Sequence, residues 1–477
     1  MPAGGDRSAN TLRDFLPVRR SKPAVWCGIL CLGTVFSACS GPTFSGKPNV
    51  ILISLDTLRR DAVGSSNGRV SLTPRIDSFA ESSIVYAAAY TSVPFTLSAH
   101  MTMLTGYHHA VHGVAGIGTS LPSSIPTLAE LLADRGYRTF GRYTTEWLDP
   151  DFGFGRGFDS YVKVQHAATY AWRVNDSAVT AIEEARRSGE PFFAFLHYYD
   201  PHSDFVNQSR TSWPYFAPPE YRAQVATSED DFCIGEHDCA SRFLVVCNRD
   251  HLEVSQTVTE DLRRLYESGV RYTDQAVGEL LEFIRDAGLL ATSVVVITSD
   301  HGEEFREHGM FLHSQVYEET VAVPLILHLP LGLGGGSTVN QPVDLREVFS
   351  VIERMTRGDV EMTASTAKEL PLSEQTLLLQ DKTNGETWGL LRDDWKIIVD
   401  RSRGGVELFR RDSDSLDASD LAPEHPELVR ELRELLESRI ADYAQSRQSI
   451  EQGGQVTGVP TLSAEERSRL EALGYLQ

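Results

Sequence analysis

The chain has 477 residues, which is long for one compact core, so we expect a large domain with a smaller one appended. Hydrophobic residues make up 41% of the sequence and charged residues 23%, as in an ordinary globular protein. The formal net charge is -22 and lysine and arginine form no basic cluster, which argues against nucleic acid as a partner. Acidity of this kind favours solubility and says nothing about chemistry.

The N-terminal segment 1–39 has the pattern of an export signal. A charged stretch at 19–22 (RRSK) is followed by an apolar run at 23–38 that is short for a membrane-spanning helix. The run ends in FSAC, which resembles the lipobox of bacterial lipoproteins, in which the cysteine is lipidated and becomes the mature N-terminus; Phe36 stands where leucine is usual. We expect export to the periplasm or cell envelope, with membrane attachment through a lipidated Cys39 left open and a buried or anchoring helix as the alternative.

Three cysteines, Cys233, Cys239 and Cys247, lie beyond this signal. In an oxidising compartment two of them can pair and the third stays odd, and the sequence does not choose the pair. A three-cysteine metal site is the alternative. The surrounding residues favour a surface insertion held by a disulfide.

Strands and helices are expected to alternate over residues 48–345, the predicted catalytic domain. One helix begins with a capping box formed by Thr127 and Glu130 and stops at Gly136, and residues 259–288 predict a long amphipathic crossover helix. Continuous apolar runs predict strands buried on both faces at 49–56, 191–202, 293–304 and 322–329. The pattern indicates an α/β fold with a doubly wound, mostly parallel sheet.

The composition changes after about residue 330, where a glycine-rich stretch is typical of a linker. Residues 346–445 predict a smaller C-terminal subdomain with an antiparallel sheet and a charged amphipathic helix at 425–445. Its short strands are expected at 374–380, 387–394, 395–400 and 406–411. Residues 446–477 predict a flexible tail with a short terminal helix.

Three of the predicted strands carry polar side chains where they end. In open α/β sheets, sites form beyond the carboxyl ends of the strands, so these chain-distant residues are expected on one rim. Oxygen and imidazole ligands at such a rim suit a divalent cation. Each residue also has an ordinary interpretation as a turn, cap or hydrogen-bonded loop residue. The strand-end residues are Asp56, His197, Asp200, His202, Asp300 and His301.

Five segments, taken in order, resemble the motifs of the sulfatase family in the alkaline phosphatase superfamily. The likeness covers nearly the whole mature chain and implies the fold of that family and activity on an anionic ester. The segments are 49–64 (NVILISLDTLRRDAVG), 96–113 (TLSAHMTMLTGYHHAVHG), 195–202 (FLHYYDPH), 299–327 (SDHGEEFREHGMFLHSQVYEETVAVPLIL) and 405–422 (GVELFRRDSDSLDASDLA).

The resemblance implies one divalent metal ion held by Asp56, Asp300 and His301. Sulfatases commonly have a second aspartate after the first, and here that position is Thr57. With one carboxylate fewer, the site favours calcium, the usual metal of the family, less strongly, and it favours manganese or zinc more strongly. A two-zinc site that adds Asp200, His202 and His313 is the alternative.

The resemblance to sulfatases also implies roles for two histidines. His202 matches a histidine that in relatives contacts the anionic oxygens or the leaving group, and His313 falls where many relatives have a lysine. An imidazole can serve as an anion donor or as a general acid. Other histidines are expected to be structural: His108, His109, His112, His308 and His328.

The family's nucleophile is a cysteine or serine in a C/S-x-P-x-R element that is converted to formylglycine. Alignment on the Leu-Thr-Gly run puts Thr96 at the nucleophile position, Ser98 at the proline position and His100 at the arginine position. His100 would supply a weaker positive charge than the arginine. No formylglycine is expected, since threonine is not a substrate for that conversion. A hydroxyl beside a metal can instead attack phosphorus, helped by the helix N-terminus. The alternative is that Thr96 is only a helix N-cap.

These features predict an exported, metal-dependent hydrolase of sulfate or phosphate esters, with Thr96 favouring phosphodiesters or phosphonate esters. The expected partner is an anionic ester substrate, which a glycan or a lipid would carry. Two alternatives stay open: a phosphoryl-group transferase acting on a glycan or lipid, and a non-catalytic binder of anionic glycans. Substrate specificity is expected to lie in the insertion 203–251 and in the C-terminal subdomain.

Overall fold

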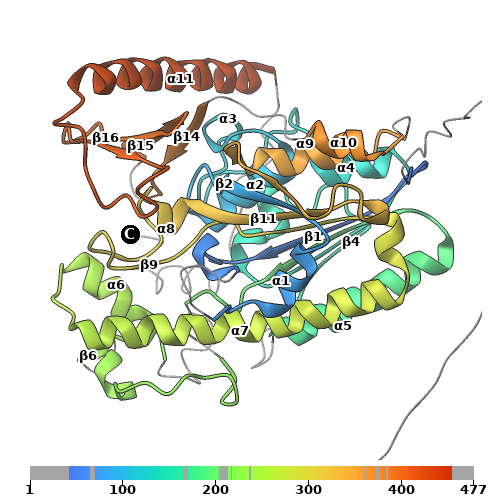
Figure 1. Cartoon of the computed structure of the whole chain (residues 1–477), viewed down its shortest axis with the longest axis horizontal. Helices are drawn as coiled ribbons and strands as arrows, with labels where there is room; N and C mark the ends of the chain where they lie inside the picture. Colours follow the sequence, from blue (N-terminus) through green and yellow to red (C-terminus); the bar gives the residue numbers. More distant parts are fainter. Residues whose placement is uncertain are drawn as a thin grey trace, which may run out of the picture. The chain divides into compact units, whose positions relative to one another are not determined.

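A nine-stranded, mostly parallel β-sheet is the centre of this computed structural model (Figure 1). The structure describes residues 42–64, 70–164, 170–203, 213–215, 217–235, 238–358, 361–370, 376–382 and 385–453. In spatial order the strands are β12 (Ser337–Val339), β2 (Ile84–Tyr90), β11 (Ala322–His328), β8 (Ser293–Thr298), β1 (Asn49–Leu55), β5 (Phe192–Tyr198), β3 (Arg138–Tyr143) and β4 (Ser160–Lys163), and β13 (Val343–Asp344) also pairs with β2. Strand β11 runs antiparallel to both of its neighbours, β2 and β8.

The continuous apolar runs of the central strands reflect burial on both faces of the sheet. In β1, Val50 and Leu52 belong to the core on one face, while Ile51 and Ile53 belong to the core on the other. Successive side chains of a strand point to opposite faces, so both faces of β1 need apolar residues. All four residues are fully buried.

Helices cover both faces of the sheet, which confirms the doubly wound architecture (Figure 1). On one face lie α1 (Pro74–Ala80), α5 (Tyr170–Ser188) and α7 (Gln256–Asp286). On the other lie α2 (Thr96–Thr105), α4 (Leu128–Asp134) and α9 (Arg346–Met355). Helix α7 is the predicted crossover helix, and α4 begins with the predicted capping box of Thr127 and Glu130.

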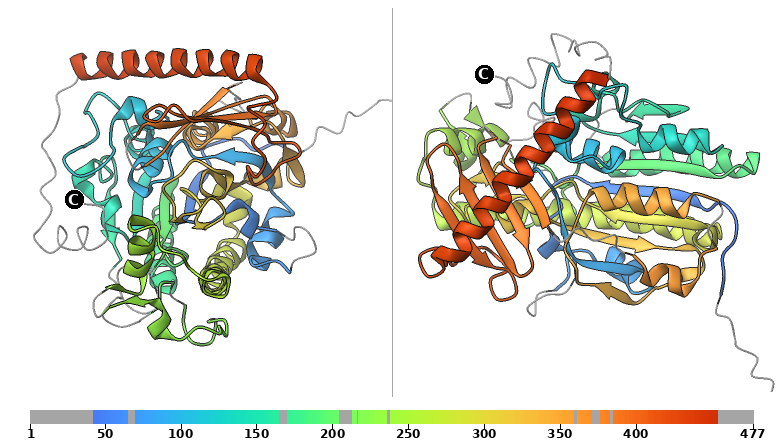
Figure 2. Two further views of the ribbon diagram at one scale, coloured as in Figure 1. Left: turned by 90° about the vertical axis from the view of Figure 1, so that its left-hand side faces the viewer. Right: turned by 90° about the horizontal axis from the view of Figure 1, so that it is seen from above.

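The predicted C-terminal sheet is present as a meander of four antiparallel strands. Helix α11 (Pro426–Gly453) lies across one of its faces, where Leu432 and Leu436 are buried (Figure 2). The opposite face packs against β2 and the short helix α8 (Glu318–Val321) through residues such as Tyr90 and Val321. The strands are β14 (Thr376–Gln380), β15 (Thr387–Arg392), β16 (Trp395–Asp400) and β17 (Val406–Arg410).

A buried group of charges lies between this sheet and the main one. The Lys396 ammonium, which is completely buried, donates hydrogen bonds to Asp417 and to Glu318, while Arg60 pairs with the second oxygen of Glu318 at 2.8 Å. Each buried carboxylate therefore faces a positive charge. The remaining described α-helices and strands are short: α3 (His109–His112), α6 (Ser241–Arg249), α10 (Ala364–Lys368), β6 (Cys233–Ile234), β7 (Asp238–Cys239), β9 (Glu304–Phe305) and β10 (Phe311–Leu312).

The structure differs from the sequence prediction at several places. Strands β2, β3 and β4 were not predicted, and α9 packs against α2 although it begins at the expected domain boundary. Helix α11 continues to Gly453, past the predicted end at residue 445. The predicted signal with Cys39, and most of the predicted tail, lie outside the described residues. Within the described residues, every helix is too short or too polar to span a bilayer.

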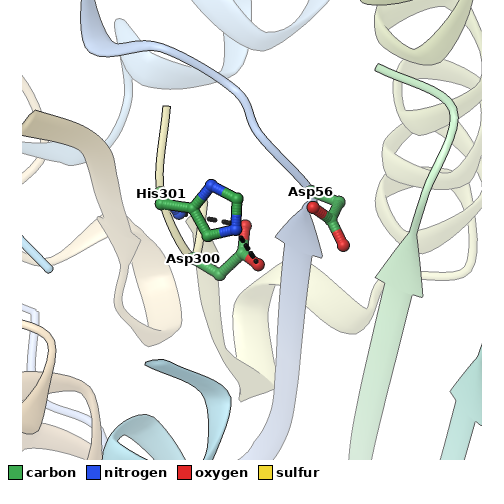
Figure 3. Close-up of side chains that lie close together, drawn as sticks. All are labelled: Asp56, Asp300 and His301. Carbon is green, nitrogen blue, oxygen red and sulfur yellow. Dashed lines mark hydrogen bonds and ion pairs between the residues drawn. The ribbon is translucent and has the colours of Figure 1, made fainter. Parts of the chain in front are cut away.

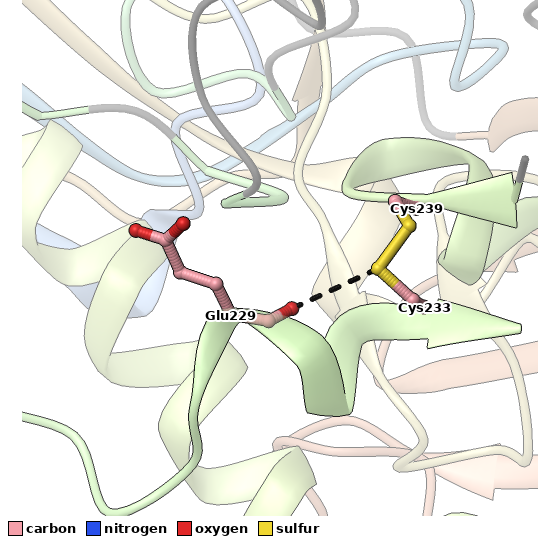
Figure 4. Close-up of a disulfide and its surroundings, with 3 residues drawn as sticks. All are labelled: Glu229, Cys233 and Cys239. Carbon is pink, nitrogen blue, oxygen red and sulfur yellow. Dashed lines mark hydrogen bonds between the residues drawn. A yellow bond between two sulfur atoms is a disulfide. The ribbon is translucent and has the colours of Figure 1, made fainter. Parts of the chain in front are cut away.

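The insertion after His202 contains a disulfide between Cys233 and Cys239 (Figure 4). It joins β6 and β7, and Cys233 Sγ also lies 3.9 Å from the backbone oxygen of Glu229. Cys247 is a buried free thiol in α6. The three cysteines therefore do not form a metal site together.

Candidate active site

The side chains of Asp56, Asp300 and His301 meet at one edge of the main sheet (Figure 3). Asp56 follows β1, and Asp300 and His301 follow β8. These strands are parallel neighbours, with Ser54 opposite Thr298, so their carboxyl ends reach the same edge. One ligand atom from each residue lies within 4.8 Å of the other two, and all three residues are buried.

Hydrogen bonds fix the Asp56 carboxylate and leave one of its oxygens without a partner. His197 Nε2 donates to Asp56 Oδ2 at 3.0 Å, and the hydroxyl of Thr144 lies 3.0 Å from His197 Nδ1. The Asp56 backbone N–H donates to the carbonyl of Tyr198 at 2.8 Å. Asp56 Oδ1 is buried and accepts no hydrogen bond from the described residues.

In Asp300 too, one carboxylate oxygen accepts hydrogen bonds and the other accepts none from the described residues. Its Oδ1 accepts hydrogen bonds from the backbone N–H groups of Thr57 at 3.1 Å and His301 at 3.0 Å. Its Oδ2 accepts none from the described residues and lies 3.3 Å from His301 Nε2. Thr57 reaches this position with a φ of 55°, a strained conformation for a β-branched residue.

The orientation of His301 is set by its own backbone neighbour. His301 Nδ1 donates to the carbonyl of Gly302 at 3.0 Å, so the lone pair of Nε2 is directed toward Asp300. Gly302 is required here, because a Cβ at this position would lie 2.0 Å from the backbone oxygen of Glu319.

This donor set fits a divalent cation. Burial, followed by repulsion from Asp300 and Glu303, raises the pKa of Asp56 well above its usual value, and burial also raises the pKa of Asp300. Two buried carboxylates at one point repel each other, and each presents an oxygen that accepts no hydrogen bond within the described part of the chain. A bound cation would balance the charge and complete the coordination of both oxygens, with His301 Nε2 as the third ligand.

The structure places Thr96 beside this donor set. Thr96 is the first residue of α2, its hydroxyl lies 3.4 Å from His301 Nε2, and 2% of its surface is exposed. The N-cap of the helix is Phe95, which forms no side-chain capping bond. The alternative that Thr96 is only an N-cap is therefore wrong for this structure.

His100 lies one turn after Thr96 in α2, close to Asp300. Its Nδ1 donates to the Thr96 carbonyl at 2.8 Å, and the Ser54 hydroxyl lies 2.9 Å from its Nε2. The ring is fully buried, which lowers its pKa, and Nδ1 is 3.7 Å from Asp300 Oδ2. These contacts support the first turn of α2 and Asp300. A direct contact of His100 with substrate stays a prediction.

His202 and His313 complete a histidine cluster next to His301. The His313 ring centroid is 4.2 Å from that of His301 and 5.1 Å from that of His202. His202 Nδ1 donates to the carbonyl of Ser203 at 2.8 Å. Burial lowers the pKa of His202 to about 3 and that of His313 well below its usual value, so both rings are neutral at pH 7.

Sequence reasoning missed the groups that orient His313. His313 Nδ1 donates to Glu303 Oε2 at 2.8 Å, and the hydroxyl of Tyr215 donates to Glu303 Oε1 at 2.6 Å. This leaves His313 Nε2 as the unprotonated nitrogen of the ring. The described residues contain one group of three or more candidate metal ligands, and it does not include Asp200, His202 or His313, so a second metal ion has no such support.

Lys382 is a second group that sequence reasoning missed. It follows β14 of the C-terminal sheet, and its ammonium lies 5.0 Å from the centroid of the Phe95 ring, next to Thr96. Burial lowers the pKa of Lys382 to about 7, against the opposing effect of Glu303 and Asp56. No local pattern marks this lysine, because its position depends on where the C-terminal sheet packs.

The chain matches a family model called Sulfatase over residues 48–352. It is 25% identical to arylsulfatase K of Gallus gallus over 476 residues, covering 87% of this chain and 86% of the relative. Its fold matches the structure of BT4656 in complex with its substrate D-glucosamine-2-N,6-O-disulfate, with a TM-score of 0.64 and 18% identity over 84% of this chain and 98% of the other.

The fold also matches a phosphonate monoester hydrolase from Silicibacter pomeroyi, with a TM-score of 0.61 and 18% identity over 83% of this chain and 96% of that one. The family match covers every strand of the main sheet, all the candidate metal ligands and the nucleophile position. The chain belongs to the sulfatase family, within the alkaline phosphatase-like superfamily, and is a hydrolase of sulfuric or phosphoric esters.

Proposed function

We propose that this sulfatase-family protein is a metal-dependent hydrolase in which Thr96 is the nucleophile and the substrate is a phosphate diester or a phosphonate ester. The observation that carries the proposal is the position of the Thr96 hydroxyl at the N-terminus of α2, 3.4 Å from His301 Nε2 and beside two unsatisfied carboxylate oxygens. The fold shared with a structure named as a phosphonate monoester hydrolase supports an ester of phosphorus.

Threonine has one hydroxyl, and this determines the chemistry that it can perform. A hydrated formylglycine attacks with one hydroxyl and releases sulfate through the other, whereas a threonine ester must be cleaved by water. The Thr96 route therefore forms an Oγ1–P bond, breaks the bond from phosphorus to the leaving oxygen, and ends when water cleaves the phosphothreonine. A bound divalent cation supplies positive charge that favours the deprotonated hydroxyl and the anionic ester oxygens.

The proton of Thr96 needs an acceptor and the leaving oxygen needs a donor. His202 and His313 are neutral, and each uses Nδ1 to donate to the protein, so Nε2 is the basic nitrogen. One of these imidazoles takes the proton from Thr96 and returns it to the leaving oxygen, which balances the first half-reaction. The first N–H groups of α2 have no carbonyl partner within the helix, and together with the helix dipole they favour the negative charge of the ester.

For the metal, we propose one divalent ion per chain bound by Asp56, Asp300 and His301. Two carboxylates and one imidazole favour manganese or zinc over calcium. Metal analysis of the purified protein tests the number and the identity together. Two tightly bound zinc ions per chain would overturn the one-metal proposal.

The deciding experiment compares an ester panel on wild type, Thr96→Val and Thr96→Ser. The panel contains an aryl sulfate, a phosphate monoester, a phosphate diester and a phosphonate ester. We expect the wild type to prefer the diester or the phosphonate, Thr96→Val to lose this activity, and Thr96→Ser to keep part of it. Mass spectrometry of acid-quenched enzyme should find a phosphorylated peptide that contains Thr96.

Other outcomes would redirect the assignment. Hydrolysis that survives in Thr96→Val would show that Thr96 is not the nucleophile. A preference for the aryl sulfate would place the substrate among sulfate esters. Metal binding without activity on any ester would favour the non-catalytic binder of anionic glycans.

We also propose export, on the support of the sequence of residues 1–39 alone. Expression of the full chain in a bacterial host should give a mature protein that begins at Cys39, and palmitate labelling should report lipidation. Cys39→Ser should then abolish labelling. A cytoplasmic protein that keeps residues 1–39 would contradict export.

A further inference from the structure

The turn after β14 carries Lys382 into the candidate active site. The Lys382 backbone N–H donates to the carbonyl of Ser314, the residue after His313, at 3.4 Å. Its ammonium lies 5.0 Å from the ring centroid of Phe95, the residue before Thr96. Lys382 therefore contacts both segments that carry the proposed nucleophile and its proton carrier.

Apart from the proposed metal ion, the described groups around Thr96 that can donate to an anionic ester are imidazoles. His202 and His313 each donate through Nδ1 to the protein, and the ring nitrogens of His100 are held by Thr96 and Ser54. The Lys382 ammonium, by contrast, is close enough to interact electrostatically with several side chains of the site. These side chains are Asp56, His202, His301, Glu303 and His313.

We propose that Lys382 is a catalytic residue that binds an anionic oxygen of the ester and so makes the C-terminal sheet part of the active site. The inference rests on the proposed function. A lysine ammonium is a compact charge with three donors, suited to an oxyanion, and a hydrogen bond between charged groups is stronger than a neutral one. Lysine is needed here because an anion enters a site that already holds several carboxyl groups.

A chain of hydrogen bonds from the histidine-rich segment after α2 fixes the base of this turn. The Ser92 hydroxyl lies 3.1 Å from His109 Nδ1, and His109 Nε2 donates to Gln380 Oε1 at 2.5 Å. Gln380 Nε2 donates in turn to the carbonyl of Gly385 at 2.7 Å, across the turn that carries Lys382. Burial lowers the pKa of His109 to about 4, so the ring carries one proton at neutral pH, and the contact with the acceptor Gln380 Oε1 places it on Nε2.

His109 and Gln380 are thus positioning residues for Lys382. The amide of Gln380 can accept from His109 and donate to Gly385 in one orientation only, so the pair holds both sides of the turn. This gives a role to a histidine that the sequence assigned only to loop structure.

The test measures anion binding as well as turnover. Titration calorimetry with inorganic phosphate and with inorganic sulfate, on metal-loaded protein, gives Kd for wild type, Lys382→Ala, Lys382→Gln and Lys382→Arg. Kinetics on the ester panel give kcat/KM for the same proteins. The matched control is Arg403→Ala, in the turn after β16 of the same sheet, whose side chain is 88% exposed.

We expect Lys382→Ala and Lys382→Gln to weaken anion binding and kcat/KM by about 10- to 100-fold, the usual range for a hydrogen bond to a charged group. Lys382→Arg should recover most of this loss, and Arg403→Ala should change neither quantity. Should Lys382→Ala fail to fold, Lys382→Gln carries the test. Unchanged Kd and kcat/KM in Lys382→Gln would overturn the proposal.

A double-mutant cycle separates positioning from a general structural effect. Gln380→Ala should weaken phosphate binding in the wild-type background and add little to Lys382→Gln, because both changes act through the same contact. Fully additive losses would contradict the positioning role. If wild type cleaves no ester, the proposed function fails, while the effect of Lys382→Gln on the phosphate Kd still decides whether Lys382 binds the anion.

Discussion

His197 Nε2 lies 3.0 Å from Asp56 Oδ2, and both side chains are completely buried. The hydrogen bond holds the carboxylate so that Oδ1 is the oxygen left for a cation. His197 was expected to be either a strand-end ligand or a hydrogen-bonded loop residue. The contact makes it a support for a ligand, and such supports tune metal affinity.

Loss of this support should weaken metal binding before it affects the fold. We expect His197→Gln to lower the affinity for manganese or zinc by about 10- to 100-fold, as for other groups that orient metal ligands. Isothermal titration calorimetry with the metal ion measures this affinity. The control is His425→Gln, an exposed histidine near Trp395 of β16, which should leave the affinity unchanged. Equal affinities for wild type and His197→Gln would show that Asp56 needs no such support.

A second prediction concerns the pH dependence of stability. Burial lowers the pKa of His308, but the hydrogen bond to Glu319 at 2.6 Å outweighs it and raises this pKa to about 9. The folded pKa then exceeds the unfolded one, so the contribution of His308 is fully present below about pH 6.5 and is lost as the pH rises through about 9.

Urea unfolding of wild type and His308→Gln between pH 6 and pH 10 tests whether the contribution of His308 to stability falls as the pH rises. The free energy of unfolding of the wild type should exceed that of His308→Gln at pH 6, and the difference should shrink toward pH 10. A gap that widens with pH would contradict the assignment of the proton.

The buried charges around Lys396 predict a large loss of stability on removal of one partner. Lys396→Met leaves Asp417 and Glu318 without the ammonium between them, and we expect a loss of about 3–5 kcal/mol in the free energy of unfolding. Chemical denaturation measures it. In the control, Arg430→Ala removes an exposed pair with Glu427 and should cost about 1 kcal/mol or less. Similar losses in both variants would mean that the buried cluster contributes no more than a surface pair.

Close packing at Gly302 gives a fourth prediction. A Cβ there would meet the backbone oxygen of Glu319 at 2.0 Å, so Gly302→Ala must displace either α8 or His301. We expect a loss of at least about 1–3 kcal/mol of stability, together with weaker metal binding. Thermal unfolding with and without metal reports both effects. Gly116→Ala, where a Cβ meets nothing within 4 Å, is the control, and a Gly302→Ala protein as stable as this control would contradict the contact.

The sequence predicted the central strands and the metal ligands for the same physical reason. Strand β1 is apolar on both faces and is followed directly by Asp56, and Asp300 follows shortly after β8, so strand burial and the strand-end rule locate the ligands together. Strand β2 was missed because its alanine-rich sequence IVYAAAY has no continuous run of large apolar residues. The reversed direction of β11 depends on its neighbours and is not encoded in its own apolar pattern.

The groups that approach from other elements escaped prediction. Tyr215 reaches Glu303 from an insertion, and Lys382 reaches Phe95 from another sheet, so no local spacing connects them to the site. Their neighbours in space are set by tertiary packing, which a one-dimensional pattern does not contain. His197 is a similar case. Its position at a strand end placed it at the edge of the sheet, but the sequence does not show which oxygen accepts its hydrogen bond.

The pairing of β1 also has a consequence for how the protein folds. Asp56 meets His197 across 141 residues of chain, and Thr57 meets Asp300 across 243 residues. Strand β1, at the middle of the sheet, is thus synthesised well before its partner strand β8. Distant contacts of this kind slow folding, so the edges of β1 stay exposed until synthesis is well advanced, and this period is when the chain is most open to aggregation.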